Sequence, residues 1–457
     1  MTTTALLAPL PLPPLLPSNR LLGHLARFRD DPLGLFEEGR ALGDVVRMRV
    51  GPRTITVVYH PDAVHRVLVE RLPHYTKRTR GYAMLRRLLG NGLLTAEGAL
   101  WKRQRRIAQP AFQHRRLGGF AHTMTAATEA LAAEWQGPAE RGEVVDVAEA
   151  MNRLALKIAG ETLFSLDISG ESDEIGTALS GILGGFLASI TNPLRAWLPL
   201  PSTFRYHRAR RKLDALVYAI IARRRAEGVD KDDLLGLFMS ARDEDGQGMS
   251  DEQLRDEVLT MLLAGHETTA NALAWTLHHL AGSPEATARL HDELDTVMPD
   301  RRFELERYPA LTYTQAVLDE SMRLTPPAWV ESRRAEEEDE IGGYRIPRDG
   351  FVFLSQYAIH RHPAFWADPT RFDPARFLPG GQVCPDGSPR PRGAFFPFGD
   401  GQRKCIGEHF ARMEGRIILS MLASRFTFTP VPDTPVVPEP SVTLRPRGGL
   451  KLRLGLR

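Results

Sequence analysis

Between about Leu100 and Val297 the apolar residues recur every three or four positions, which is the spacing of amphipathic helices. Four segments show this pattern most clearly, at residues 99–109, 120–135, 147–164 and 204–228. Two more follow, at 311–324 and 406–426. The first of these stops before Pro326 and Pro327, because the residue before a proline avoids the helical conformation. The pattern predicts a mainly helical protein.

The longest helix is predicted from about Ser250 to Ala281, with Ser250 as the N-cap and Gln253 as its capping-box partner. Its middle is apolar on nearly all sides, which indicates that neighbouring elements cover it. About thirty residues at ~1.5 Å each give a rod of ~45 Å, long enough to cross a domain.

Strand patterns are short and few. Residues 44–50 and 54–59 form two β-branched runs around a Gly-Pro turn, which predicts a β-hairpin, and a short helix is predicted at 61–70. Further strands are predicted at 341–347, at 351–357 and twice near the C-terminus. We therefore expect a mainly α fold with small β-sheets. No linker is apparent, so residues 1–457 are predicted to form a single domain.

The N-terminus is apolar, but its prolines exclude a continuous helix. It lacks the basic start and the cleavage site of a signal peptide. We expect residues 1–20 to be an extended lead-in on the surface. Since no run approaches ~20 apolar residues, no membrane-spanning helix is expected, and the predicted location is cytoplasmic.

Charge and cysteine content narrow the choice further. The 59 basic and 56 acidic side chains give a net charge of +3, too balanced for a protein that binds nucleic acid. The two cysteines, Cys384 and Cys405, exclude a disulfide framework and a four-cysteine zinc site.

Cys405 lies in a distinctive segment, FPFGDGQRKCIGEHF, at residues 396–410. Three glycines around it allow tight turns and close approach of the backbone to a flat ligand. The start of the last helix favours a thiolate, which is the axial ligand that a haem iron needs. Arg403 can reach an anionic group. The segment fits F-x-x-G-x-R-x-C-x-G at every fixed position: Phe398, Gly401, Arg403, Cys405 and Gly407, with Gly399 as the third glycine.

Two other interpretations of Cys405 were considered, a buried structural cysteine and a cysteine nucleophile. Neither explains the fixed neighbours, so haem ligation is preferred. Cys384, in a coil without such neighbours, is interpreted as incidental.

A second motif, AGHETT, lies at residues 264–269 within the long helix. Gly265 costs ~1 kcal/mol against alanine in a helix interior. Glu267 and Thr268 introduce polar groups into an apolar stretch, and a threonine hydroxyl can bond to the carbonyl four residues earlier. The alternative is a set of core polar groups with no chemical role.

Two side-chain pairs share helix faces. Glu320 and Arg323 are three apart and Trp101 and Arg105 are four apart, so the members of each pair point the same way. An ordinary surface ion pair is worth only ~0–1 kcal/mol. An indole N–H with an arginine fork suits carboxylates, although a basic surface helix with a core tryptophan would have the same pattern.

These motifs, in this order, resemble the cytochrome P-450 superfamily of haem-thiolate monooxygenases, from the hairpin at 44–59 to the final strands. The resemblance implies the cytochrome P-450 fold, with haem b between the long central helix and the Cys405 loop. It also implies that Cys405 ligates the iron. The other residues that it places at the haem are Phe398, Gly399, Arg403, Gly407 and Ala264.

The resemblance assigns roles to the remaining motifs. Glu267 and Thr268 would supply protons during oxygen activation, which favours an enzyme that uses O₂. Arg376 would join Glu320 and Arg323 in a buried cluster for folding and haem retention, where loss of one partner costs ~3–5 kcal/mol. Trp101, Arg105 and Arg333 would bind the haem propionates. The neighbouring Arg334 is the alternative to Arg333.

By resemblance, the substrate pocket draws its walls from residues 72–92, 181–200, the long helix, 327–331 and 441–443. The walls are apolar, which implies an apolar substrate such as a terpenoid, carotenoid or fatty acid. Each wall residue has the alternative of being plain core. The candidates are Leu85, Leu88, Phe186, Met261, Ala264, Ala328 and Trp329.

We therefore predict a monomeric monooxygenase that hydroxylates or epoxidises its substrate with O₂. Electrons would come from a separate ferredoxin or flavodoxin and an NAD(P)H-dependent reductase. The alternatives are a haem-thiolate peroxygenase or isomerase, and a non-catalytic haem sensor. Positive charge for docking an acidic partner would come from the cysteine side, at Lys102, Arg103, Arg106, Lys404 and Arg412.

Overall fold

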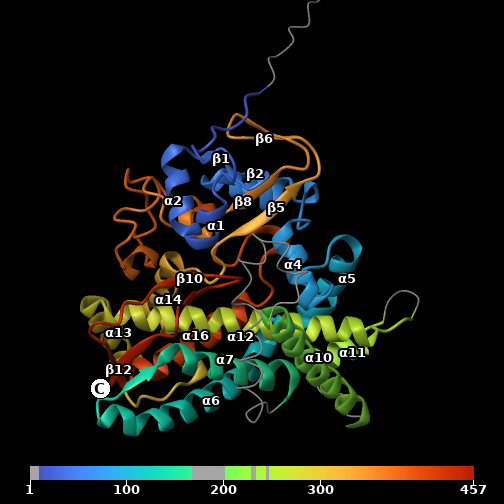
Figure 1. Ribbon diagram of the computed structural model, residues 1–457. Coiled ribbons are helices and arrows are strands. Elements are labelled where there is room, and N and C mark those ends of the chain that lie inside the picture. Colours follow the sequence, from blue (N-terminus) through green and yellow to red (C-terminus); the bar gives the residue numbers. More distant parts are fainter. Residues whose placement is uncertain (1–9, 167–200, 228–232, 243–245) are drawn as a thin grey trace, which may run out of the picture.

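The longest helix, α12 (Asp251–Ala281), crosses the middle of the computed structural model, which describes residues 10–166, 201–227, 233–242 and 246–457 (Figure 1). It begins as predicted, because the Ser250 hydroxyl accepts a hydrogen bond from the Gln253 backbone N–H at 3.2 Å. Among the described residues, the side-chain amide nitrogen of Gln253, which is a donor, has no hydrogen-bond partner.

Other helices cover α12 on several sides, so its middle is buried as the all-round apolar pattern predicted. Helices α7 (Val147–Phe164), α10 (Pro201–Glu227), α14 (Thr312–Leu324) and α16 (Glu408–Ala423) pack directly against it. Helix α6 (His114–Glu140) packs against α7 and α16. The remaining α-helices in the described ranges are α1 (Leu25–Asp30), α2 (Pro32–Leu42), α3 (Pro61–His65), α4 (Arg80–Leu89), α5 (Gly98–Ala108), α11 (Leu234–Ser240), α13 (Pro284–Val297) and α15 (Gln356–Ile359).

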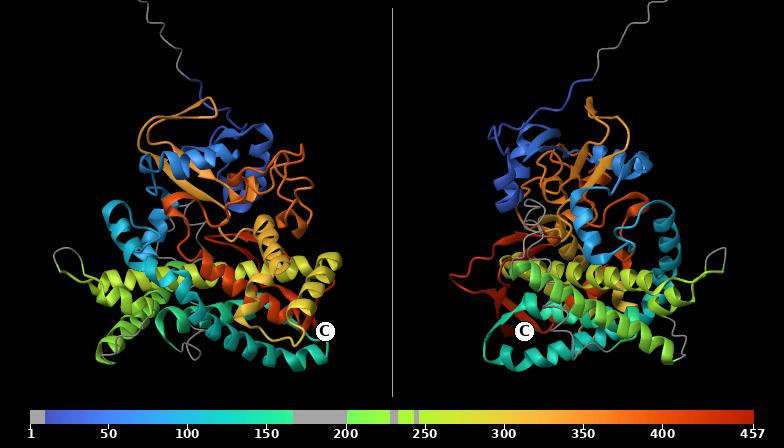
Figure 2. Two further views of the ribbon diagram at one scale, coloured as in Figure 1. Left: turned by 180° about the vertical axis from the view of Figure 1, so that it is seen from behind. Right: turned by 45° about the vertical axis from the view of Figure 1, so that its right-hand side comes forward.

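A five-stranded sheet lies on the side of α12 that faces away from α6 (Figure 2). Its order is β1-β2-β8-β5-β3, and it begins with the predicted hairpin of β1 (Val45–Val50) and β2 (Arg53–Val58). Strand β8 (Phe351–Leu354) runs parallel to β2, and β5 (Glu331–Ala335) and β3 (Tyr75–Thr76) follow with antiparallel pairing. Both views in Figure 2 keep this sheet and α6 at opposite ends of the molecule, with α12 between them. Residues of β2, β5 and β8 and residues of α12 line a common cavity.

Three smaller sheets complete the fold and confirm the mainly α class with small sheets. Strand β12 (Lys451–Leu456) pairs with both β4 (Val144–Asp146) and β9 (Phe426–Pro430). Strand β10 (Pro438–Pro440) pairs with β11 (Leu444–Pro446), and β6 (Asp339–Ile341) with β7 (Tyr344–Ile346). Two strands were predicted near the C-terminus, but β9 to β12 are four, because very short strands leave little pattern in the sequence.

The proline-rich lead-in runs along the edge of the sheet over residues 10–20. The Arg47 N–H donates to Pro14 O at 2.8 Å, and the Leu16 N–H donates to Arg47 O at 2.9 Å. This pairing covers the open edge of β1. Within the described ranges, no helix is long and apolar enough to cross a membrane.

Candidate active site around Cys405

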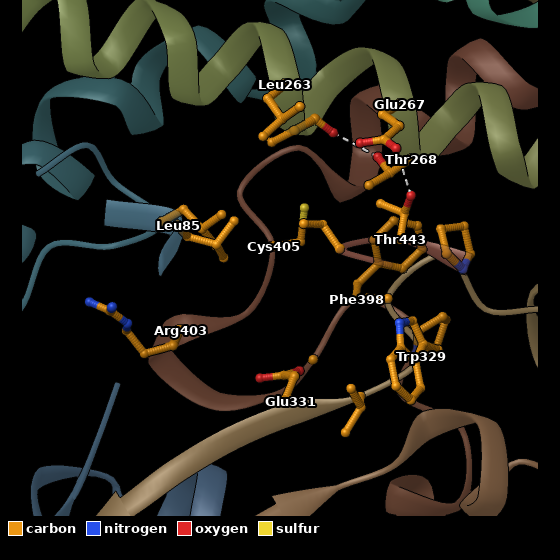
Figure 3. A pocket seen from close by; sticks show the side chains of 18 of the residues that line it. Leu85, Leu263, Glu267, Thr268, Trp329, Glu331, Phe398, Arg403, Cys405 and Thr443 are labelled. Atoms are coloured by element: carbon orange, nitrogen blue, oxygen red, sulfur yellow. Dashed lines mark hydrogen bonds between the residues drawn. The ribbon is translucent and has the colours of Figure 1, made fainter. Parts of the chain in front are cut away.

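A cavity of about 580 Å³ lies between α12 and the segment that carries Cys405. Its walls come from α4, α5 and α12, from residues 327–332, 397–407 and 441–443, and from the β1–β2 turn. In Figure 3 the Cys405 sulfur points toward α12, where Glu267 and Thr268 lie. A thiol and an acid–alcohol pair thus face one mainly apolar space.

Backbone geometry sets the position of Cys405. Its N–H donates to Phe398 O at 2.9 Å, which closes the turn of the 398–405 segment. Gly399 and Gly401 have φ of 71° and 67°, the left-handed region that favours glycine. At Gly401 a Cβ would lie 2.2 Å from the Leu68 carbonyl oxygen, so no larger residue fits there.

Gly407 does not adopt the tight-turn conformation that was predicted for all three glycines. Its φ is −89°, an ordinary value, and it is the N-cap of α16. A Cβ there would lie 3.9 Å from Cys405 Sγ, which is normal contact. Glycine at 407 is therefore not needed for a turn, and its effect is to leave room beside the sulfur.

Burial has the largest effect on the pKa of the Cys405 thiol. Its side chain is accessible from the cavity but lies deep in the protein, and burial raises the pKa of the thiol. The Gly407 N–H and the charge of Arg105 oppose this shift, in the direction predicted for the helix start. They do not outweigh burial, and the pKa of the Cys405 thiol lies above its ordinary value.

Across the cavity, Thr268 donates its hydroxyl hydrogen to the Ala264 carbonyl at 2.6 Å, the back-bond anticipated from the motif. The helix stays continuous there. Glu267 is buried and turns toward the C-terminal segment, where its Oε1 accepts a hydrogen bond from the Thr443 hydroxyl at 2.9 Å. Within the described part of the chain, Glu267 Oε2 has no partner. Burial raises the pKa of this carboxyl, while Thr443 and the charge of Arg445 partly oppose the shift.

Residues 441–444 make further hydrogen bonds to both walls of the cavity. The Asn271 amide donates to Thr443 Oγ1 at 3.1 Å, and the Trp275 indole donates to Leu444 O at 3.0 Å. The Trp329 indole donates to Ser441 O at 3.0 Å, and the Leu444 N–H donates to Pro327 O at 2.9 Å. This segment was expected to form a wall, but the partnership of Thr443 with Glu267 was not predicted.

Several cations gather beside the cavity. Arg105 donates to Lys404 O at 2.9 Å, and Arg403 donates to Ala96 O at 2.8 Å. The Arg403 guanidinium lies 4.3 Å from the centre of the Trp101 ring. Trp101, Arg105 and Arg403, which the resemblance assigns to the haem, all line the cavity.

Arg333 and Arg334 lie on opposite faces of β5. Arg333 is buried and pairs with Glu331 at 2.8 Å, whereas Arg334 pairs with the exposed Asp349 at 2.6 Å. This arrangement favours Arg333 over Arg334 for any role in the interior. Arg333 is not among the described residues that line the cavity, although Glu331 and Tyr82 beside it are.

Sequence reasoning missed Lys77, which is buried in the same cluster. Its Nζ donates to Leu94 O at 3.0 Å and lies 4.9 Å from the centre of the Tyr82 ring. Burial, with the charges of Arg403 and Arg333, holds the pKa of Lys77 well below its usual range. A single lysine in a segment without periodicity gives no sequence signal.

The cluster holds more positive than negative charge. Among the described residues, Arg105, Arg333 and Arg403 face Glu97 and Glu331, and the Lys77 amine, whose pKa is lowered, adds a further donor. The pKa of Arg403 falls to about 10, mainly through burial. Buried charge is costly unless an anion compensates it. Haem carries two propionates, so these residues and a thiol facing the same cavity fit that group.

The predicted Glu-Arg-Arg cluster is present on the cysteine side. Arg323 and Glu320 are fully buried and joined by two hydrogen bonds of 2.7 and 2.8 Å. Arg323 also donates to the carbonyls of residues 360, 369 and 371. Arg376 lies 3.5 Å from Glu320, and the Asp373 N–H donates to Glu320 at 2.8 Å. The cluster thus joins α14 to the chain that precedes the cysteine segment.

Most of the predicted wall residues face the cavity. Leu85, Met261, Ala264, Ala328 and Trp329 line it, as do Phe398, Gly399 and Gly407. The assignment of Leu88 to the cavity wall is wrong, because Leu88 is buried in the main core and is not among the lining residues that the structure describes. Its side chain packs in the main core cluster together with Leu89 and Leu93. Phe186 lies outside the described residues.

The cavity has two further apolar wall residues, Leu93 and Leu94, from the loop between α4 and α5. They were not among the predicted wall residues. On the cysteine side, Lys404 and Arg412 form ion pairs with Glu408, and Arg412 also pairs with Asp319 at 2.7 Å. Their charge is thus partly neutralised, which weakens the predicted basic surface at these two positions.

Comparison with known proteins agrees with this site. The cytochrome P450 family profile matches residues 11–453. Cyclooctatin synthase of Streptomyces melanosporofaciens is 37% identical, over 93% of this chain and 91% of its own. Pentalenene oxygenase of Streptomyces avermitilis is 34% identical, over 96% of each chain. The crystal structure of the cytochrome P450DA heme domain matches with a TM-score of 0.88 and 29% identity, over 98% of both chains.

The family carries a haem whose iron is bound by a cysteine thiolate, and its monooxygenases use O₂ and electrons from a redox partner. Cyclooctat-9-en-7-ol 5-monooxygenase of S. melanosporofaciens is 36% identical, over 91% of this chain and 89% of its own. With Cys405 facing Thr268 across an apolar cavity, and with this likeness over nearly its whole length, the chain belongs to the cytochrome P450 family and is a haem-thiolate monooxygenase.

Proposed function

We propose that this cytochrome P450 inserts one oxygen atom into an apolar terpenoid, by hydroxylation or epoxidation. The observation that carries the proposal is the cavity itself, with Cys405 on one side, Glu267 and Thr268 on the other, and apolar walls between them. Two relatives support the terpenoid class over fatty acids and carotenoids, since their names refer to cyclooctat-9-en-7-ol and pentalenene.

The cofactor in this proposal is haem b, and it supplies the activation of O₂ when its iron is bound by a thiolate. Cys405 would hold the iron. Trp101, Arg105 and Arg403, together with Lys77 and Arg333, would hold the propionates. The gathering of three arginines and the Lys77 amine beside only two glutamates in this part of the described structure supports the assignment.

Glu267 and Thr268 would handle protons. Because burial raises the pKa of Glu267, its carboxyl retains a proton at pH values where an exposed glutamate has lost it. Thr443 orients that carboxyl, and the Thr268 hydroxyl stands at the cavity surface. The apolar walls limit access of bulk water, so protons arrive through these groups.

Thr268→Ala tests this role. We expect product formation to fall by up to about 10²-fold, the usual scale of a positioned proton donor, with a smaller fall in NAD(P)H consumption. The ratio of product to NAD(P)H measures the coupling. Unchanged coupling would remove Thr268 from the mechanism. The same pair favours O₂ over the peroxygenase, isomerase and sensor alternatives.

Electrons would come from a separate ferredoxin or flavodoxin, reduced by an NAD(P)H-dependent enzyme. Lys102, Arg103 and Arg106 on α5 support an acidic partner, because α5 also carries the residues beside the cavity. Reduction is expected to slow steeply with added salt. A single domain over residues 1–457, a monomeric state and a cytoplasmic location remain predictions.

The decisive experiment is the absorption spectrum of the reduced, carbon-monoxide-bound protein, recorded beside Cys405→Ser. We expect a strongly red-shifted Soret band that the variant loses, because only a thiolate ligand produces it. A band unaffected by the substitution would contradict ligation by Cys405. Spin-state shifts with terpenoid, fatty-acid and carotenoid probes, followed by product analysis, then test the substrate class.

A further inference from the structure

The loop between α4 and α5 is attached to α12 by two neighbouring buried carboxylates. Asp256 Oδ2 accepts the Asn91 N–H at 2.7 Å, and Glu257 Oε2 accepts the Leu93 N–H at 3.0 Å. Glu257 is fully buried and Asp256 nearly so. Among the described residues, Glu257 Oε1 has no hydrogen-bond partner. Nothing in the proposed chemistry uses this pair.

Glycines allow the loop to approach α12 this closely. Gly90 has φ of 61°, and a Cβ there would lie 2.0 Å from Asp256 Oδ2. At Gly92 a Cβ would lie 2.1 Å from Thr260 Oγ1 and 2.6 Å from the Asp256 carbonyl oxygen. The loop therefore lies directly on the helix, with no space for a side chain between them.

The loop carbonyls are held from other directions. Gln104 donates to Asn91 O at 2.9 Å, and Arg86 donates to Thr95 O at 2.7 Å. Lys77 donates to Leu94 O at 3.0 Å. Asp256 and Glu257 accept hydrogen bonds from the backbone N–H groups of Asn91 and Leu93 in this loop. In the described structure, these two side chains alone connect the loop to α12 through side-chain hydrogen bonds.

This attachment bears on the cavity because Leu93 and Leu94 are wall residues. Thr260 and Met261, one turn after Glu257, are wall residues as well. From Glu257 to Ala264 the helix rises by about 10 Å, so one continuous helix carries both this acidic pair and the cavity-lining Ala264 and Thr268. The position of the loop relative to those lining residues is then set by Asp256 and Glu257.

We propose that Asp256 and Glu257 are positioning residues, which fix the wall formed by Leu93 and Leu94 and so determine which substrate shapes fit over the haem. This inference rests on the proposed function, because it concerns the substrates of the proposed reaction. Burial and the neighbouring Asp256 raise the pKa of Glu257 to about 8, so a glutamine closely matches its neutral form. Glu257→Gln therefore preserves the acceptor, and Glu257→Met removes it at similar volume.

The test uses the haem-loaded protein and two azole probes, imidazole and 4-phenylimidazole, titrated by the shift of the Soret band. Loss of one buried hydrogen bond, worth ~1 kcal/mol, corresponds to about fivefold in affinity. In Glu257→Met we expect the Kd for 4-phenylimidazole to rise by about fivefold or more, and that for imidazole to stay within about twofold. Glu257→Gln and the exposed control Glu252→Met should behave as wild type.

A second readout is amide hydrogen exchange. In Glu257→Met the Leu93 N–H should exchange faster, with the helix amides of α7 unchanged. Gly92→Ala moves the loop while leaving both carboxylates in place, and it should reproduce the azole effect. The proposal is overturned if Glu257→Met and Gly92→Ala keep the wild-type ratio of azole affinities. It is also overturned if both lose the haem-thiolate band, since the pair would then be needed for folding alone.

These outcomes can be distinguished from a failure of the proposed function. Absence of the red-shifted carbon-monoxide band in the wild type contradicts the haem-thiolate assignment. A normal band with unchanged azole selectivity contradicts only the role of Asp256 and Glu257.

Discussion

The cysteine side and the α12 side of the cavity are built differently. On the cysteine side, Arg323 directs hydrogen bonds to Glu320 and to three backbone carbonyls. On the α12 side, the described structure leaves Glu267 Oε2, Glu257 Oε1 and Thr260 Oγ1 without hydrogen-bond partners. Paired groups rigidify a support, whereas unpaired buried groups remain available for protons and water. The hydrogen bonds of Arg323 brace the cysteine side, although Arg376 Nε and both Glu414 carboxyl oxygens there also lack hydrogen-bond partners in the described structure. Among the same described residues, the unpaired Glu267 Oε2 on α12 instead lies beside Thr268 at the cavity.

Removing Glu320 should expose the largest difference between the two sides. In Glu320→Ala, two buried arginines lose their carboxylate partner, which we expect to cost ~3–5 kcal/mol of unfolding free energy. Denaturant unfolding and haem content measure the loss. Glu285→Ala, an exposed acid in a long 3.8 Å ion pair with Arg371, is the control and should cost under about 0.5 kcal/mol. Equal stability of the two variants would show that the cluster does not support the fold.

Replacing Lys77 sharpens the comparison, since its effect should differ with and without haem. Lys77→Met removes the hydrogen bond to Leu94 O but also the cost of burying the amine beside Arg333 and Arg403, so the stability of the haem-free protein should change by under about 1 kcal/mol. A charged hydrogen bond to a propionate is lost, worth ~1.5–3 kcal/mol, so haem dissociation should accelerate by about tenfold or more. Transfer of haem to apomyoglobin measures this rate. Lys102→Met on exposed α5 should leave it unchanged, and equal rates in both variants would remove Lys77 from the haem site.

Thr443→Val should give the smallest effect, confined to the α12 side. The Thr443 hydroxyl lowers the pKa of Glu267 against the raising effect of burial, so its removal raises that pKa further. The hydrogen bond is worth ~1 kcal/mol, under one pKa unit. Because a raised pKa keeps the carboxyl protonated to higher pH, the alkaline limit of coupling should move upward. Product per NAD(P)H across pH measures it, with Thr434→Val as control, and a downward shift would contradict the assignment.

The sequence predicted the cysteine side more completely than the α12 side. The Cys405 loop and the Glu320–Arg323 pair lie within short windows, where spacing alone implies a shared turn or helix face. Lys77 and Thr443 act on Arg403 and Glu267, which lie far away in sequence, so no local pattern reveals them. Leu88 was assigned to the cavity because an apolar helix residue looks the same in sequence whether it faces a cavity or the core.

The hydrogen bonds that tie residues 441–444 to the cavity walls also bear on the order of events during biosynthesis. At ~5–20 residues per second, Thr443 is polymerised roughly 9–35 s after Glu267. The pocket cannot close before residues 441–444 have been made, which leaves an interval in which haem can enter before this segment docks.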